Sequence, residues 1–356
     1  MEPVTHLLTG ACLSRLGFNR RTALATATMV LAAEVPDLDI LWYFDDSVSG
    51  FAHHRGFSHT LLGVPVDAAL ALGFVFLYWR WIGRERMAKR VGERGPAQWE
   101  QPRWLLLFWF GCIAALSHIL LDFTNNYGVR PFAPFRPQWY SWDIVFIVEP
   151  VLWVVLLIGL LAPAFSRLVG QEVSSRRGSA RAPGGRGGAI FALLCMVALW
   201  GVRDYQHRSA LGELNSFLYR GEEPIRLSAY PYMINPFRWH GVVETRDFFA
   251  LAPVNLLGQN DAAASPRIRF KPEETPVSLA AKRSRLGRVY LDWAQYPLVE
   301  IEQKEGAQPG YTVHFYDLRF AYPDRAAPAL GAVVELDQNL KVVDEYFESP
   351  RGSKGR

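Results

Sequence analysis

Long apolar stretches separated by short polar segments fill the first 203 residues, and beyond them hydrophobic and polar positions mix over short distances. A bilayer's hydrocarbon core requires roughly 20 largely apolar residues in one helix. Four segments reach or approach that length: 60–82, 104–123, 144–165 and 189–203. The pattern therefore predicts a mainly α fold class, with a polytopic transmembrane helical domain over residues 1–203.

The beginning of the chain is less regular. Two shorter apolar pieces, 4–14 and 22–35, are separated by the stretch SRLGFNRR. They fit either a helical hairpin that dips into the membrane or two buried helices that the predicted spans cover. The sequence leaves both arrangements open.

From residue 204 the sequence predicts short strands separated by turn residues. RDYQHRSALGEL continues the last span as a helix, and an apolar i, i+3, i+4 pattern predicts another helix over 277–295. Clean alternation of apolar and polar positions over 312–320 predicts a strand with one buried face. The stretch 332–348 predicts a hairpin that turns at Asp337–Asn339.

Further strands are expected in the same region, at 235–245, 248–257, 267–272 and 298–303. We therefore predict a small α+β domain over 204–350, with a mostly antiparallel sheet. The tail 351–356 is polar and rich in glycine and lysine or arginine, and we expect it to be disordered.

The charge distribution indicates how the predicted spans are oriented. The net charge is only +4, so the composition does not predict nucleic-acid binding. Positive charge is instead concentrated in 83–103 and 166–188, and loops rich in Lys and Arg mark the cytoplasmic side. Loops 36–59 and 124–143 then face outward from a bacterial-type inner membrane, as does the domain after residue 203.

Metal-ligating side chains gather on this predicted outer side. FAHHRGFSHT (51–60) holds three histidines, and SHILLD places His118 and Asp122 four residues apart on one helix face. Ionisable residues at membrane depth are costly and usually face a bundle interior or a wet cavity. Imidazole nitrogen and carboxylate oxygen suit a divalent transition metal, with Zn expected first and Mn as the alternative. A histidine that a nearby carboxylate merely orients is the competing explanation.

The turn HHRGFSH concentrates these side chains further. Gly56 allows a tight turn, and His54 and His59 can converge from its two sides. Arg55 can hold an anionic group through two hydrogen bonds.

Asp37 and Asp39 of PDLD, and His6 of THLLTG, each have two explanations. A Pro-Asp pair often starts a helix or turn, because the carboxylate caps free backbone N–H groups. His6 likewise fits an ordinary polar residue at a helix start. In the functional interpretation, these residues ligate the metal or orient a histidine that does so.

In this order, and separated by hydrophobic spans, these motifs resemble the YdjM-like family of inner-membrane-associated metal-dependent hydrolases, also described as LexA-binding. The residues that match its signature are His6, Asp37, Asp39, His54, Arg55, Gly56, His59, His118 and Asp122. Ser58 and Thr60 stand where the family often has Thr and Ser, and His53 is additional. The resemblance covers residues 1–165. It implies metal-dependent hydrolysis at the membrane, and we predict no LexA contact from these residues.

The sequence thus predicts a membrane-bound metal-dependent hydrolase that acts at the bilayer surface. The expected metal ligands are His6, Asp37, His54, His59, His118 and Asp122. A metal-activated water would be the nucleophile. Arg55 would bind an anionic group of a phosphoester or lipid-linked substrate, and Asp39 would act as the general base.

Two other functions fit the same residues. One is a non-enzymatic membrane protein with a structural metal site and an outer domain that binds a protein partner. The other is a proton-coupled carrier that uses His118 and Asp122, which is disfavoured because the polar residues crowd one end of the spans. A catalytic zinc site keeps an open coordination position, whereas a structural one is closed.

Overall fold

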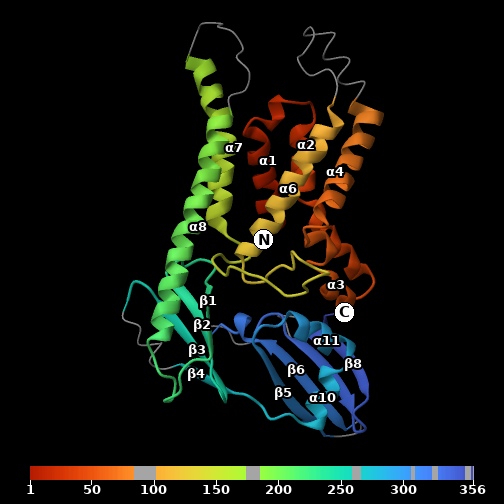
Figure 1. The fold of residues 1–356 in the computed structure, drawn as a ribbon, viewed down its shortest axis with the longest axis vertical. Helices are drawn as coiled ribbons and strands as arrows, with labels where there is room; N and C mark the ends of the chain where they lie inside the picture. Colours follow the sequence, from red (N-terminus) through yellow and green to blue (C-terminus); the bar gives the residue numbers. More distant parts are fainter. Residues whose placement is uncertain are drawn as a thin grey trace. The chain divides into compact units, whose positions relative to one another are not determined.

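The computed structural model describes residues 1–83, 102–173, 185–258, 266–305, 309–322, 328–348 and 354–355. Its internal contacts divide the chain into two compact units (Figure 1). The helical unit comprises Met1–Leu38 and Arg55–Val202, and the C-terminal unit comprises Asp39–His54 and Arg203–Arg356. A short N-terminal segment therefore belongs with the C-terminal half of the chain.

The described residues up to Asn215 contain three 3-10 segments, the helix α3 (Ser47–His53) of the C-terminal unit and six other α-helices. The helices are α1 (Pro3–Arg15), α2 (Ala25–Ala32), α4 (Val64–Tyr78), α6 (Trp104–Thr124), α7 (Pro150–Val173) and α8 (Arg186–Asn215). The 3-10 segments are η1 (Phe18–Arg20), η2 (Val35–Phe44) and η3 (Phe57–His59), and the π-helical η4 (Trp79–Gly83) continues α4.

Three of the described helices are long and apolar enough to cross a membrane: Val64–Gly83, Trp104–Thr124 and Arg186–Asn215. They correspond to three of the four predicted spans. The span predicted over 144–165 begins later, at Pro150, and its apolar part Pro150–Pro163 is shorter. The difference arises because the backbone before it is extended, with the amides of Ile144 and Val145 donating to the Thr124 carbonyl.

The first 35 residues form two short helices rather than a span. α1 packs against α2, α6 and α7, and α2 packs against α4 and α6. Neither reaches the length that a bilayer requires. This packing favours the prediction of buried helices covered by the longer ones.

The longer helices separate small inward residues from large outward ones. The inward faces of α4 and α6 carry the buried residues Ala68, Ala71, Ala114 and Ala115. The exposed apolar residues include Leu70 and Phe74 on α4, Leu105 and Trp109 on α6, Val154 and Leu161 on α7, and Phe191 and Leu194 on α8. Small interior residues allow close helix packing, and large apolar patches at the surface mark contact with membrane or protein.

The C-terminal unit contains two antiparallel sheets, with strand orders β1-β2-β3-β4 and β5-β6-β7-β8-β9. The first sheet consists of β1 (Arg226–Pro231), β2 (Arg238–Glu244), β3 (Phe248–Asn255) and β4 (Arg267–Phe270). The second consists of β5 (Pro297–Lys304), β6 (Gly310–Asp317), β7 (Ala332–Asp337), β8 (Val342–Glu348) and β9 (Lys354–Gly355). The short η5 (Leu318–Phe320) follows β6. The predicted antiparallel α+β character of this region is confirmed.

Three details of the C-terminal unit differ from the sequence prediction. The single helix expected over 277–295 is divided into α10 (Pro276–Lys282) and α11 (Arg285–Trp293), because the Ser284 side chain caps α11 by accepting from Gly287 N. Strand β1 was not expected. In the tail expected to be disordered, β9 pairs with β8, and the remaining tail residues lie outside the described part of the chain.

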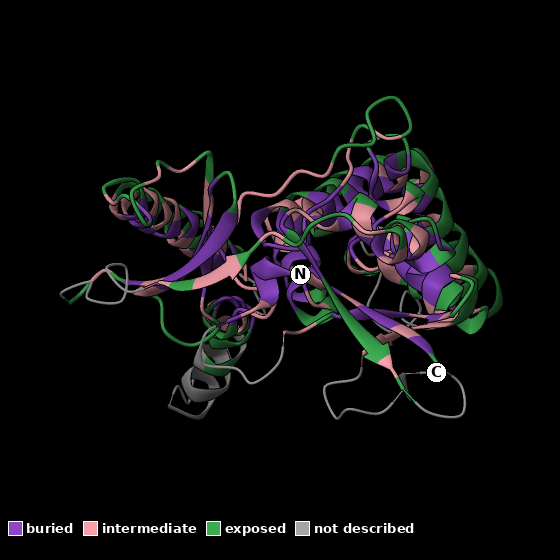
Figure 2. Cartoon of the chain, turned by 90° about the horizontal axis from the view of Figure 1, so that it is seen from below, coloured by how far each residue is buried: buried purple, intermediate pink, exposed green. Residues whose placement is uncertain are grey.

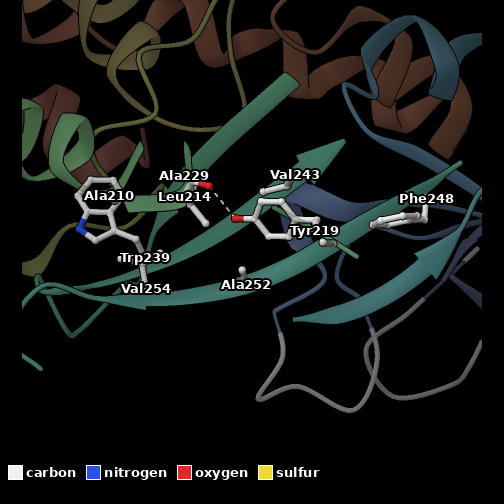
Figure 3. Close-up of a cluster of buried hydrophobic side chains, with 10 residues drawn as sticks. Ala210, Leu214, Tyr219, Ala229, Trp239, Val243, Phe248, Ala252 and Val254 are labelled. Atoms are coloured by element: carbon white, nitrogen blue, oxygen red, sulfur yellow. Dashed lines mark hydrogen bonds between the residues drawn. The ribbon is translucent and has the colours of Figure 1, made fainter. Parts of the chain in front are cut away.

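The last turns of α8 pack onto the first sheet. Ala210 and Leu214 join Trp239, Val243 and their neighbours in one buried cluster (Figure 3). The Tyr219 hydroxyl donates to the Leu214 carbonyl over 2.8 Å and so ties the end of the helix to the cluster. β2 and β3 are buried over most of their length, which makes them the centre of this core. Figure 2 shows that buried residues occur in both the helices and the strands of the chain.

We expect the crossing of α7 and α8 to depend on two glycines. A Cβ on Gly188 would lie 2.3 Å from the Gly159 carbonyl oxygen, whereas a Cβ on the adjacent Gly187 would meet nothing within 4 Å. Gly188→Ala should therefore destabilise the chain by about 1–3 kcal/mol through overpacking. The thermal unfolding midpoint in detergent measures this effect. Gly187→Ala is the matched control, and an equal shift in both variants would contradict the close helix contact.

Candidate metal centre

Four metal-ligating side chains converge within the helical unit. They come from η2 (Asp37), from η3 (His59) and from one face of α6 (His118 and Asp122). One ligand atom from each lies within 4.8 Å of all the others. His59, His118 and Asp122 are fully buried, while the Asp37 side chain remains 22% exposed. Residues far apart in the sequence thus form one cluster with a single partly open side.

α6 supplies two of these ligands through its own periodicity, since His118 and Asp122 lie one turn apart. The His118 Nδ1 atom lies 2.7 Å from the carbonyl oxygen of Ala33, at the end of α2. Because a carbonyl only accepts, Nδ1 must donate there, and Nε2 is the ring nitrogen that faces the cluster, where it can donate to Asp37 when protonated or bind a metal when deprotonated. Histidines that bind metals are commonly held by such a bond from the other ring nitrogen.

His59 reaches the cluster from a tightly turned segment. Its Nε2 atom lies 3.0 Å from His118 Nε2, 3.2 Å from Asp122 Oδ2 and 3.5 Å from Asp37 Oδ1. The Ser58 hydroxyl lies 3.1 Å from the other ring nitrogen, Nδ1. Two imidazole nitrogens that face each other beside two carboxylates form a donor set that suits a shared cation.

Asp37 stays ionised in this arrangement. Burial alone would raise the pKa of its carboxyl group, but hydrogen bonds from His118 and His59 hold that pKa well below its usual range. An ionised carboxylate is the form that binds a metal.

Arg55 compensates the buried charge of Asp122. Its Nη2 atom donates to Asp122 Oδ1 over 3.0 Å, and Nη1 donates to the carbonyl of Gly128 over 2.8 Å and to Asn125 Oδ1 over 3.2 Å. The guanidinium also lies over the Tyr127 ring, 4.7 Å from its centroid. The residue is only 3% exposed and has a left-handed φ of 53°, a conformation that costs about 1 kcal/mol for a residue with a Cβ. The observed contacts support Asp122, and the predicted contact with a substrate anion stays a prediction.

His6 adds a third imidazole next to the cluster. Its ring stacks on His118 with a centroid separation of 3.7 Å, and its Nε2 lies 3.4 Å from Asp122 Oδ1, which the Met1 amino nitrogen also contacts. Both ring nitrogens of His6 and the Oδ2 atom of Asp122 are buried without a hydrogen-bond partner among the described residues. Buried polar atoms without partners are costly, and a bound cation could satisfy Asp122 Oδ2 and one of the two His6 nitrogens. The residues present therefore fit a divalent metal.

Asp39 and His54 are paired with each other in the C-terminal unit, with His54 Nδ1 lying 3.2 Å from Asp39 Oδ1. The four converging ligands of the described chain do not include them. Their expected roles as general base and metal ligand stay predictions.

Glu34 is a nearby ionisable residue that the sequence analysis did not single out. Burial, followed by the negative charges of Asp37 and Glu2, raises the pKa of its carboxyl group to about 8. The sequence signal was an acidic residue two positions before PDLD, at the end of an apolar stretch. The segment 125–128, which contacts Arg55, is also evident in the sequence. Its spacing from Arg55 does not predict that contact.

We expect Glu34 to make the metal-free protein less stable as the pH rises. Its pKa of about 8 exceeds the ordinary value of 4.5, so ionisation opposes folding increasingly between these two values. Glu34→Gln removes this cost. Relative to the wild type, its thermal unfolding midpoint should be similar at pH 4.5 and higher at pH 8. A midpoint difference that does not vary with pH would contradict the raised pKa.

Known proteins resemble both halves of the chain. The YfhP C-terminal alpha/beta plait domain matches residues 276–351. The uncharacterized protein YfhP of Bacillus subtilis (strain 168) is 20% identical over 162 residues, which is 43% of this chain and 43% of that protein. The match thus spans less than half the length of this curated relative, and no solved structure matches the chain.

The helical part has the broader match. The family of the YdjM inner membrane protein matches residues 1–210, which is more than half of the 356 residues. This finding confirms the resemblance that the motifs predict. The chain belongs to the YdjM inner membrane protein family.

Proposed function

We propose that the protein is a membrane-bound, metal-dependent hydrolase that acts on an amphiphilic phosphoester at the bilayer surface. The observation that carries the proposal is the convergence of two imidazoles and two carboxylates, with ligand atoms within 4.8 Å of one another, at the end of an apolar helix. A charged cluster at such a place is costly and is retained where it has a function.

Asp37, His59, His118 and Asp122 would hold the metal, and His6 and His54 are further candidates. A bound divalent ion, Zn or Mn by its ligand chemistry, supplies Lewis acidity and lowers the pKa of water. The chain's own residues do the rest. The Ala33 carbonyl holds the His118 ring in place, and Asp37 presents its carboxylate on the open side of the cluster. Asp39 would accept the proton of the attacking water.

An apolar pocket lined in part by residues that follow His59 closely in the sequence supports an amphiphilic substrate. Leu61 and Leu62 line it together with Phe132, Phe135 and the charged Arg136, and its volume is about 400 Å³. It begins two residues after His59, where the Leu61 amide donates to the Pro131 carbonyl over 2.9 Å. A pocket with apolar walls and one cationic side chain suits an acyl chain that carries an anionic group.

We further propose that the chain is a multi-pass inner-membrane protein whose metal centre and C-terminal domain face away from the cytoplasm. The support is the excess of Lys and Arg in 83–103 and 166–188. Residues 84–101 and 174–184 of these two segments lie outside the described part of the chain.

A structural metal site with a partner-binding outer domain is the second candidate. The complete burial of His59, His118 and Asp122 favours it, because a closed site leaves no room for substrate. The partial exposure of Asp37 favours catalysis instead.

The first prediction from this proposal concerns metal content. Detergent-purified wild-type protein should retain about one equivalent of a divalent metal. His59→Ala and His118→Ala should each lose most of it, because each removes one ligand of a shared site. Elemental mass spectrometry measures the content. His314→Ala is the control, since His314 pairs with Glu348 in the C-terminal unit. Metal retained equally in all variants would contradict the site.

The second prediction concerns the substrate. Phe135→Ala should raise the KM for a long-chain phosphatidic acid about tenfold, because the acyl chain loses an apolar contact. The KM for the dihexanoyl analogue should change much less. Phosphate release from mixed micelles measures both. Equal changes for the two chain lengths would argue against an acyl-chain pocket, and release that persists after a chelator has removed the bound metal would exclude the proposed chemistry.

A further inference from the structure

The segment 39–54, which we call the strap, interrupts the ligand-bearing part of the chain. Asp37 precedes it by two residues, Arg55 follows it directly, and His59 lies five residues after its end. The strap nevertheless belongs to the C-terminal unit, whereas the residues on both sides of it belong to the helical unit.

The strap closes on itself at its base. Its first and last residues are paired, with Asp39 Oδ1 lying 3.2 Å from His54 Nδ1. Next to this pair, Trp42 stacks on His53 with ring centroids 4.2 Å apart. A compact surface loop of about 6–16 residues whose ends meet is an Ω-loop, and such loops behave as units.

The tip of the strap is held by the C-terminal unit. Arg285 of α11 donates to Asp46 Oδ2 over 2.9 Å and to the Ser49 hydroxyl over 2.6 Å. Phe51 is only 7% exposed, and its ring centroid lies 5.2 Å from that of Trp293 and 4.7 Å from that of Phe347. One aromatic anchor and one charged clamp therefore fix α3 to α11 and β8.

We propose that the C-terminal domain positions the ligands of the metal centre by holding the strap, with Phe51 and Arg285 as positioning residues. The inference rests on the proposed metal centre. A held strap limits the freedom of the two chain ends that lead to Asp37 and to His59. Ligands that are preorganised in this way bind more tightly, because less conformational entropy is lost on binding.

The coupling must act in both directions. If docking of the strap strengthens metal binding, metal binding strengthens docking of the strap by the same factor. A residue that only contributes to the stability of the C-terminal domain has no such effect, so this reciprocity distinguishes a positioning role from a structural one.

The test is a Co²⁺ titration of the full chain in detergent, followed by visible absorption. Phe51→Ala and Arg285→Ala should bind Co²⁺ about 10-fold more weakly than the wild type, a factor within the range typical of two coupled sites. Phe51→Leu and Arg285→Lys should recover most of the affinity. Lys282→Ala is the matched control. Lys282 ends the neighbouring helix α10 and pairs with the exposed Glu274, so its loss should not change the Co²⁺ affinity.

Hydrogen exchange provides the second readout. Co²⁺ should slow amide exchange within the strap in the wild type, and this slowing should be lost in Arg285→Ala, a change at a half-exposed side chain that does not disturb the core. Equal Co²⁺ affinity in all variants, or metal-independent exchange in the strap, would overturn the coupling and leave the metal centre standing. A wild type that binds no Co²⁺ would overturn the metal centre and this inference together.

Discussion

The buried carboxylate of Asp122 sets the main constraint on the helical unit. Asp122 lies in the last turn of the apolar helix α6, and its side chain is fully buried. An uncompensated charge at such a position would cost several kcal/mol. Arg55 supplies a positive charge to one carboxylate oxygen, and the imidazoles of His59 and His118 face the other. The turn that carries Arg55 and His59 is therefore held against the end of α6 by the same charge that the metal centre requires.

This constraint explains several local features. The left-handed backbone conformation of Arg55 is costly, and the contacts of its guanidinium offset that cost. These contacts are with Asp122, Asn125, Gly128 and Tyr127. α2 is short and ends where its Ala33 carbonyl can accept from His118. Small residues between α4 and α6 let these helices approach closely enough for the cluster to form.

Much of this could be predicted from the sequence. Helical spacing alone placed His118 and Asp122 on one face, and hydropathy located the helices that carry the site. The motifs also identified the family. The sequence could not reveal that His54 pairs with Asp39, because that contact depends on how the strap closes on itself. Nor could it show that the Arg55 guanidinium donates to other residues of the chain, because these partners lie 67 to 73 residues further along the sequence.

The division of the chain adds a functional dimension to the fold. The YdjM family matches residues 1–210 and the C-terminal plait domain matches 276–351, so the two matches do not overlap. The strap nevertheless places part of the first match in the C-terminal unit. A domain that holds the segment between two metal ligands has a physical means of influencing them. On the proposal made above, the C-terminal domain would act on the cluster of Asp37, His59, His118 and Asp122 through the strap, although none of these four residues belongs to it.

X-ray absorption at the metal K-edge, recorded on the detergent-purified chain, tests the central claim most directly. The cluster of Asp37, His59, His118 and Asp122 predicts a first shell of nitrogen and oxygen only, at about 2.0–2.2 Å for zinc, with imidazole scattering from at least two histidines. A sulfur shell near 2.3 Å, or imidazole scattering that persists unchanged in His118→Ala, would contradict a metal centre built from these four residues.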